Sequence, residues 1–181
     1  MHDVQKVRVE LGAASYDIFL GEGLSPELCA FVKTQGFSRK ALILSDENVG
    51  KIYGEETADV LRAAGLDPVL YIVPAGEASK SLAMADEVFT CAIEAGLDRR
   101  SPVFALGGGV VGDLAGFIAA AYMRGVPFVQ LPTSLLAQVD SSVGGKVAVN
   151  HRLGKNLIGA FYQPAAVFAD FAAFSTLPER E

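Results

Sequence analysis

Residues 107–112 are the first candidates for chemistry in this sequence. They read Gly-Gly-Gly-Val-Val-Gly, which satisfies the pattern G-x-G-x-x-G, and they stand between an apolar run at 103–106 and a long apolar stretch. A strand leading into a helix is the context in which this pattern binds a dinucleotide, because glycines let a diphosphate approach the backbone and the helix start offers free N–H groups. Alternatively, the glycines only allow close packing of Gly112 and Gly116, and the pattern does not separate these readings.

The glycine pattern departs from the usual dinucleotide-binding layout. It lies late in the chain, and no acidic residue stands about 20 positions beyond it to hold a ribose hydroxyl. Asp46, at the end of the earlier apolar run 41–44, could serve the ribose. Its alternative role is to cap a helix that starts before Val49.

A second group of polar residues follows the apolar run 126–131. Thr133 and Ser134 stand where a strand should end, which is where open sheets bind ligands, although both could instead cap the next helix. Lys146 follows a glycine pair, an arrangement that suits close contact with an anion. The other members of this polar group are Asp140, Asn150, Lys155 and Asn156. Arg124, just before the run, adds a second cation near a helix end, and its alternative role is to interact with the C-terminus of that helix. A single Lys or Arg is usually a solvated charge, but their grouping in an otherwise apolar or glycine-rich stretch favours a binding site.

The elements that must position these residues alternate along the chain. The pattern predicts a hairpin from 4–11 and 16–20 around the turn 12–15, then strands at 41–44, 69–73, 103–106 and 126–131. It predicts helices at 25–35 with Ser25 as cap, at 53–64, from after the loop 74–80 to about Ala95, and from the glycine loop to about Met123. Beyond Asp140 the pattern is irregular. The fold class is therefore α/β: a Rossmann-like, open, mostly parallel sheet with helices on both faces and an N-terminal β-hairpin.

Composition narrows the classes of function. The 181 residues carry 15 basic and 21 acidic side chains, a net charge of −6, which argues against nucleic-acid binding. No apolar run is long enough to cross a membrane, and the first residues lack the apolar core of a secretion signal. Two Cys and two His, widely spaced, favour a reducing cytoplasm and provide no transition-metal site of normal spacing. We expect one domain over residues 1–181.

The combined motifs resemble the 3-dehydroquinate synthase family. The resemblance covers most of the chain from Asp46 onward and rests on PAGEASKSL, on GGGVVGDLAGFIAAAYMRGVPFVQLPTSLLAQVDSSVGGKVAVNHRLGKNLIGAFYQP, and on the terminal FSTLPERE. Sister cyclases that make inosose or valiolone rings share the loop at 132–134 and the Lys155–Asn156 pair, but are expected to differ over 140–146. Glycerol dehydrogenases share the fold and glycine loop only. An alternative from another class of function is a stand-alone nucleotide-binding module that catalyses no reaction.

The resemblance implies a reaction and its cofactors. The family converts 3-deoxy-arabino-heptulosonate 7-phosphate, a phosphorylated keto-sugar acid, to 3-dehydroquinate in the shikimate pathway of aromatic amino-acid biosynthesis. NAD transiently oxidises an alcohol, phosphate is eliminated, the ketone is reduced again, and the ring recloses by an aldol step. A divalent metal, zinc or cobalt, polarises the oxygens. The full-length enzyme is expected to be a cytoplasmic homodimer.

The resemblance also implies roles for individual residues. The residues expected to bind NAD are Asp46, Asn48, Gly76, Glu77, Lys80, Gly108, Gly109, Gly112, Asp113, Thr133, Ser134, Asp140, Lys146, Lys155 and Thr176. Those expected to face the substrate as catalytic residues are Arg124, Asp140, Lys146 and Asn156, with Arg124 and Asn156 near its phosphate. Ala75 stands where the family often has Asp, which weakens any contact assigned there.

The metal ligands of the family have no counterpart in this sequence. In the family a Gly-x-Ala-Glu segment follows the motif at the end of this chain, and two His ligands come later, on an all-helical domain. Glu181 and His151 have no motif support as ligands. We therefore expect either a chain cut at the junction to a helical metal-binding and substrate-binding domain, or a helical half that is a separate chain. In both cases we expect no turnover by this chain alone.

Overall fold

A seven-stranded sheet forms the centre of the molecule. The computed structural model describes residues 4–178, and the strand order in its main sheet is β1-β2-β9-β6-β5-β3-β4. These strands are β1 (Gln5–Val9), β2 (Tyr16–Gly21), β3 (Lys40–Asp46), β4 (Asp67–Val73), β5 (Val103–Gly107), β6 (Phe128–Pro132) and β9 (Ala166–Asp170). Only β1 and β2 pair antiparallel, as the predicted hairpin, and all other pairs are parallel. The predicted fold class is confirmed.

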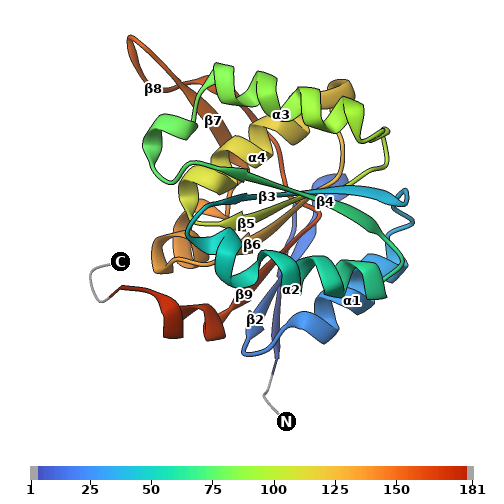
Figure 1. Cartoon of the computed structure of the whole chain (residues 1–181). Coiled ribbons are helices and arrows are strands. Elements are labelled where there is room, and N and C mark those ends of the chain that lie inside the picture. The colour runs from blue at the N-terminus through green and yellow to red at the C-terminus, as the bar shows by residue number, and fades with distance from the viewer. Residues whose placement is uncertain (1–3, 179–181) are drawn as a thin grey trace.

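Four helices cover the two faces of the sheet (Figure 1). Helices α1 (Ser25–Thr34) and α2 (Val49–Ala63) pack on one face, and α3 (Leu82–Glu94) and α4 (Gly109–Ala121) pack on the other. The alternation within β3 shows why the sheet is buried on both sides: Leu42 and Leu44 join the core under α3 and α4, while Ala41 and Ile43 join the core under α1 and α2. Among residues 4–178, none of the helices has the length and apolar character needed to span a bilayer.

The direction in which the chain crosses the sheet reverses between β3 and β5. From β3 the chain passes through α2 to β4 on one side, and from β5 it passes through α4 to β6 on the other side, over the opposite face. Helices leaving two adjacent parallel strands in opposite directions open a crevice at the carboxyl ends of those strands, where open α/β sheets bind ligands. The glycine loop follows β5, so it lies at this reversal even though it comes late in the chain.

The segment beyond Asp140 is more regular than the sequence indicates. It contains an antiparallel hairpin of β7 (Lys146–His151) and β8 (Gly154–Phe161), which packs on α4 through Val147. It also contains β9, which inserts between β2 and β6 and completes the main sheet. The expectation of an irregular segment was wrong: β7 and β8 pair with each other and pack on α4, and β9 pairs with strands that lie elsewhere in the fold.

Two helix starts also differ from the predictions. Ser25 lies inside α1, and Leu24 occupies the cap position without a side-chain cap. The cap is supplied from β9, whose Asp170 carboxylate accepts hydrogen bonds from the backbone N–H groups of Gly23 (3.0 Å) and Leu24 (2.7 Å). Helix α2 starts at Val49, four residues before the predicted start.

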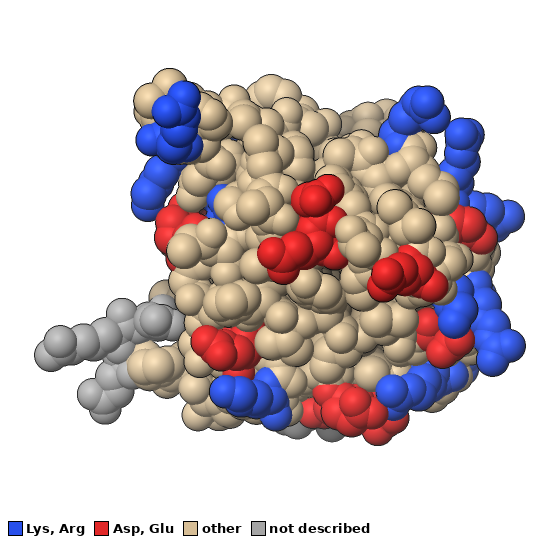
Figure 2. All heavy atoms as spheres, turned by 45° about the horizontal axis from the view of Figure 1, so that its top comes forward, with Lys and Arg blue, Asp and Glu red and all other residues tan. Residues whose placement is uncertain are grey.

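The charges are spread over the surface. Figure 2, in which the top of Figure 1 comes forward, shows acidic side chains across the middle of that face and basic ones mainly at its margins.

Candidate functional site

The carboxyl edge of the parallel sheet gathers most of the residues expected from the sequence. Five parallel strands contribute residues at or just beyond their carboxyl ends. These residues are Asp46 at the end of β3 and Asn48 after it, Gly76, Glu77 and Lys80 after β4, Gly108 and Gly109 after β5, Thr133 and Ser134 after β6, and Thr176 after β9. Because the strands are parallel, all these loops open on the same edge. The edge is thus built from segments that lie far apart in the chain.

The glycine loop is most open at Gly108. A Cβ added there would lie 3.4 Å from Ser134 Oγ, an ordinary contact, whereas one at Gly109 would lie 3.0 Å from Ser141 Oγ, a tight contact. Gly108 is the extended cap residue of α4 and makes no side-chain cap. The first N–H groups of a helix have no intrahelical partner, so those of α4 are available to an anion at this edge.

Gly112 and Gly116 instead serve the packing of α4. A Cβ at Gly112 would lie 2.9 Å from Gln130 Oε1, and one at Gly116 would lie 2.2 Å from Val147 Cγ1. Both glycines are buried. The two alternatives drawn from the sequence therefore apply to different glycines: the start of the run is open to a ligand, and its continuation lets α4 approach the sheet and the hairpin.

Lys80 and Asp113 form a half-buried ion pair beside the glycine loop. Lys80 Nζ lies 2.5 Å from Asp113 Oδ2, and the side chains are 5% and 21% exposed. Burial raises the pKa of Asp113 above its usual value of 3.8, and the Lys80 ammonium offsets part of that rise. The pair holds the loop after β4 against the first turns of α4.

Glu77 connects the same loop to the hairpin. Its Oε1 accepts a hydrogen bond of 2.7 Å from Asn150 Nδ2, and Lys155 Nζ lies 3.8 Å away. The bond from Asn150 lowers the pKa of Glu77 below its usual value of 4.5, and Lys80 and Lys155 lower it further while burial opposes them. Gly76, which precedes Glu77, has φ of 107°, a conformation that favours glycine.

Asp46 makes the contacts expected of a helix cap. Its Oδ1 accepts hydrogen bonds from the backbone N–H groups of Asn48 (2.9 Å) and Val49 (3.0 Å), at the start of α2. The neighbouring Asn48 is exposed and makes no side-chain cap. A carboxylate has lone pairs for further partners, so the capping contact is compatible with a ligand at the second oxygen.

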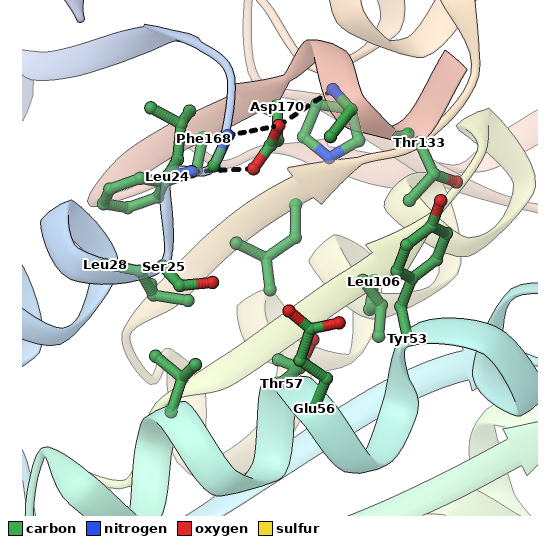
Figure 3. A pocket seen from close by; sticks show the side chains of 16 residues that line it. Leu24, Ser25, Leu28, Tyr53, Glu56, Thr57, Leu106, Thr133, Phe168 and Asp170 are labelled. Carbon is green, nitrogen blue, oxygen red and sulfur yellow. Dashed lines mark hydrogen bonds between the residues drawn. The ribbon is translucent and has the colours of Figure 1, made fainter. Parts of the chain in front are cut away.

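A pocket of about 210 Å³ opens between α1, α2 and the ends of β5, β6 and β9 (Figure 3). Thr133 faces Tyr53 across one end of it, and Leu24, Leu28 and Phe168 form an apolar wall at the other. Tyr53 Oη shares a hydrogen bond of 2.7 Å with Thr176 Oγ1, which brings Thr176 to the rim. A small, mostly apolar pocket with a few hydroxyl groups suits a planar ring.

Ser134 lies between this pocket and the glycine loop. Its hydroxyl accepts from the backbone N–H of Ala137 at 3.4 Å, so the capping alternative raised from the sequence holds for Ser134. The same Oγ lies in front of Gly108. Ser134 can therefore donate to a ligand on the glycine loop while it accepts from the following helical turn.

A second cavity, of about 370 Å³, lies between α4 and the hairpin. Three of the expected residues line it, Asp113, Lys146 and Asn156, together with apolar groups of β7 and β8 such as Leu157 and Phe161. Lys146 is exposed, and within the described part of the chain it forms no ion pair. This cavity offers a free ammonium, a carboxamide and a carboxylate.

Arg124 and Asp140 line neither of these two pockets. Both side chains are exposed. Arg124 stands just beyond α4 in a left-handed conformation, with φ of 69°. The residue after it, Gly125, contacts Tyr162, and the Tyr162 N–H donates to the carbonyl of Gly145 beside Lys146.

Three residues of the site were not among the expected ligands. Asn150 lies in the polar stretch already noted, and its double hydrogen bond could be found only from the fold. Tyr53 is half-buried on helix α2, and Asp170 is the last residue of strand β9. Neither carries a sequence signal, because each acquires its role from the arrangement of β9 and α2.

The described residues do not fit a metal site. Within residues 4–178 no group of three or more His, Cys, Asp or Glu side chains lies close enough to hold a metal ion. His151 is exposed, and its Nδ1 accepts from the backbone N–H of Leu153 at 3.3 Å. Glu181 lies outside the described residues.

Comparison with known proteins gives a consistent result. A 3-dehydroquinate synthase of Desulforamulus reducens is 51% identical over 175 residues, which are 97% of this chain and 49% of that protein. A 2-deoxy-scyllo-inosose synthase solved with carbaglucose-6-phosphate, NAD⁺ and Co²⁺ superposes with a TM-score of 0.91 at 28% identity, covering 97% of this chain and 48% of that one. A 2-epi-5-epi-valiolone synthase of Streptomyces hygroscopicus subsp. jinggangensis 5008, solved with NAD⁺ and Zn²⁺, gives 0.82 at 31%, with coverage of 95% and 47%.

The chain spans about half the length of the curated relatives it matches. The model of the 3-dehydroquinate synthase N-terminal family matches residues 70–181, which include the glycine loop, the residues lining the second cavity and Thr176. With curated 3-dehydroquinate synthases about half identical to it over nearly its whole length, this chain belongs to the family of 3-dehydroquinate synthase N-terminal domains.

Proposed function

We propose that residues 1–181 form the NAD-binding domain of a 3-dehydroquinate synthase. The complete protein then converts 3-deoxy-arabino-heptulosonate 7-phosphate to 3-dehydroquinate and phosphate, and acts as a homodimer. The observation that carries the proposal is the placement of Gly108 and Gly109 at the start of α4, at the point where the sheet reverses direction. Curated 3-dehydroquinate synthases that are about 50% identical to this chain support the choice of substrate.

The carboxyl edge fits NAD. The diphosphate lies on the free N–H groups at the start of α4, next to Gly108, Gly109 and the Ser134 hydroxyl. Carboxylates of Asp46 and Glu77 at the neighbouring strand ends accept from ribose hydroxyls. The apolar pocket beside Thr133 and Thr176 takes one ring of the dinucleotide. When bound, NAD supplies the hydride acceptor for the alcohol oxidation.

The second cavity is the proposed substrate side. Lys146 and Asn156 face the same space as Asp113, and Lys155 and Arg124 add cations on flanking segments. Within residues 4–178, the non-glycine residues with positive φ are Met123, Arg124 and Asn156. Strained backbone conformations of this kind are concentrated at functional sites. This supports the assignment of Arg124 and Asn156 to the substrate phosphate. Asp140 is proposed to stand between substrate and cofactor.

This chain alone is proposed to bind NAD without turning over substrate. The described residues do not fit a metal ion, so no step of the reaction is assigned to one here. The residues present position the cofactor and supply some of the contacts that bind and neutralise the substrate phosphate. Groups beyond these are needed to polarise the alcohol and ketone oxygens.

A sister sugar-phosphate cyclase is the second candidate, favoured by the TM-score of 0.91 to 2-deoxy-scyllo-inosose synthase. The identity to that enzyme is 28%, against 51% to the curated 3-dehydroquinate synthase. Sequence identity therefore favours 3-dehydroquinate synthase.

Titration calorimetry of the purified chain with NAD tests the cofactor proposal. The variant Gly108→Ala adds one methyl group that the fold accommodates, 3.4 Å from Ser134 Oγ, but that occupies the approach of the diphosphate. We expect NAD affinity to fall at least about tenfold, roughly 1.4 kcal/mol, with an unchanged melting temperature. Gly54→Ala, on α2, is the control and should bind NAD as the wild type does. Equal affinities of Gly108→Ala and wild type would show that the loop is structural.

A further inference from the structure

Asn150 joins three of the residues expected to bind ligands. Its backbone N–H donates to the carbonyl of Lys80 at 2.8 Å, and its Nδ2 donates to Glu77 Oε1 at 2.7 Å. Its Oδ1 accepts from the backbone N–H of Asn156 at 3.0 Å. One half-buried carboxamide thus connects the loop after β4 with the turn of the hairpin.

An irregularity in the hairpin makes these contacts possible. The ladder between β7 and β8 pairs Val149 with Ile158 and His151 with Gly154, and the register shifts between Val149 and His151. Asn150 is the residue at this bulge, so its N–H is free of the hairpin ladder and pairs with Lys80 instead, beside an isolated parallel bridge to Ser81. Bulges re-aim a side chain next to functional sites, and this one aims Asn150 at Glu77.

The contacts of Asn150 also anchor both sides of the second cavity to one loop. Asn156 lines that cavity and has φ of 58°, a left-handed conformation that a hydrogen bond to its N–H helps to maintain. Asp113 lines the same cavity and is held by Lys80. The loop carrying Glu77 and Lys80 therefore holds Asp113 directly and Asn156 through Asn150.

We propose that Asn150 is a positioning residue that couples the NAD-binding loop to the substrate side of the site, so that binding NAD at Glu77 and Lys80 orders Asn156. The proposal rests on the proposed function, since that assigns Glu77 to the cofactor and Asn156 to the substrate. A carboxamide suits the role because it donates to a carboxylate and accepts from a backbone N–H at once. Cofactor affinity and the order of the Asn156 backbone are then linked in both directions.

Hydrogen exchange of the Asn156 amide, measured by NMR in the whole 181-residue chain with and without NAD, tests the coupling. In the wild type we expect NAD to slow this exchange. In Asn150→Ala, which removes both side-chain hydrogen bonds, the amide should exchange about tenfold faster without NAD and should no longer respond to NAD. His151→Ala, at the neighbouring position of β7, is the matched control and should leave both the rate and the response unchanged.

Two further variants separate a coupling role from general support of the hairpin. Asn150→Asp keeps the acceptor for the Asn156 N–H but sets a second carboxylate against Glu77, so Asn156 should stay protected while NAD affinity falls about tenfold. Adding Glu77→Gln to that variant restores a donor–acceptor pair, so the double variant should bind NAD as tightly as Glu77→Gln alone. A weaker affinity of the double variant than of Glu77→Gln alone, or exchange and affinity in Asn150→Ala equal to wild type, would show that the proposal is wrong. If the wild-type chain bound no NAD, the proposed function would fail, and the NAD-free exchange of Asn156 would still decide whether Asn150 positions it.

Discussion

At the scale of single residues, the half-buried pair of Lys80 and Asp113 gives the sharpest prediction. Lys80→Met keeps the length of the buried stem but leaves the Asp113 carboxylate without its cation. We expect the free energy of unfolding to fall by about 2–4 kcal/mol, because an uncompensated charge remains in a poorly solvated place. Urea unfolding at neutral pH measures the loss.

An exposed ion pair on the same sheet provides the control. Lys40 Nζ and Asp67 Oδ2 are 2.8 Å apart, and both side chains are more than 40% exposed. Lys40→Met should cost less than about 1 kcal/mol, since solvent already screens that pair. Equal losses for the two variants would contradict the account of Lys80.

The pH dependence of the Lys80→Met loss has a definite sign. Burial already raises the pKa of Asp113 above 3.8, and removal of the Lys80 ammonium raises it further. A carboxyl group with a raised pKa binds more protons in the folded state than in the unfolded one, so its contribution to stability falls as pH rises through that window. The difference between Lys80→Met and wild type should therefore be largest at neutral pH and shrink below about pH 5, a trend that unfolding curves at several pH values would reveal.

At the scale of elements, close packing of α4 governs which glycines tolerate change. A Cβ at Gly116 would lie 2.2 Å from Val147 Cγ1, a stiff β-branched side chain, so Gly116→Ala should destabilise the fold by about 1–2 kcal/mol. In Gly54→Ala the added Cβ meets only the flexible end of Leu70, at 2.8 Å, and the higher helix propensity of alanine should leave stability equal or improved by up to about 1 kcal/mol. Thermal melts of the two variants check the contrast, and a melting temperature of Gly116→Ala at or above wild type would contradict it.

Most elements were predictable because their signals are local. The apolar run 41–44 lies within β3, which also includes Lys40 at its start and two polar residues, Ser45 and Asp46, at its end. The side chains of Ser45 and Asp46 bond to a carbonyl and to the helix start. Gly65 and Gly96, both with positive φ, lie just beyond α2 and α3, as the predicted helix ends required.

The elements that were missed depend on distant partners. Strand β9 is only five residues long and follows a segment without a clear alternating pattern, and it is stabilised by parallel pairing with β2 and β6. The hairpin of β7 and β8 contains polar residues and glycine, and it is fixed by the packing of Val147 and Val149 under α3 and α4. The contacts of Asn150 depend on the position of that hairpin. The sequence therefore shows that the segment around Asn150 is polar, but it does not indicate which residues Asn150 contacts.

At the scale of the whole molecule, the chain is expected to fold and bind cofactor but not to catalyse. A phosphate-release assay on the 181-residue chain with NAD, zinc or cobalt, and the keto-sugar acid phosphate should give no signal above a Lys146→Ala control. The reason is that the described residues do not fit a metal, and losing such transition-state contacts removes several kcal/mol each. The free energy of unfolding of Lys146→Ala itself should lie within about 0.5 kcal/mol of the wild-type value, because Lys146 is exposed. Metal-dependent phosphate release well above that control would overturn the expectation.

The central claim is that NAD binds across the carboxyl edge with its diphosphate at the start of α4. Amide chemical shifts recorded during an NAD titration test it most directly. The account predicts the largest shifts at Gly108, Gly109 and Val110, with further changes at Glu77 and Ser134, and none of comparable size at Gly54. Saturable shifts that leave the glycine loop unchanged, or the absence of any shift at millimolar NAD, would contradict the account.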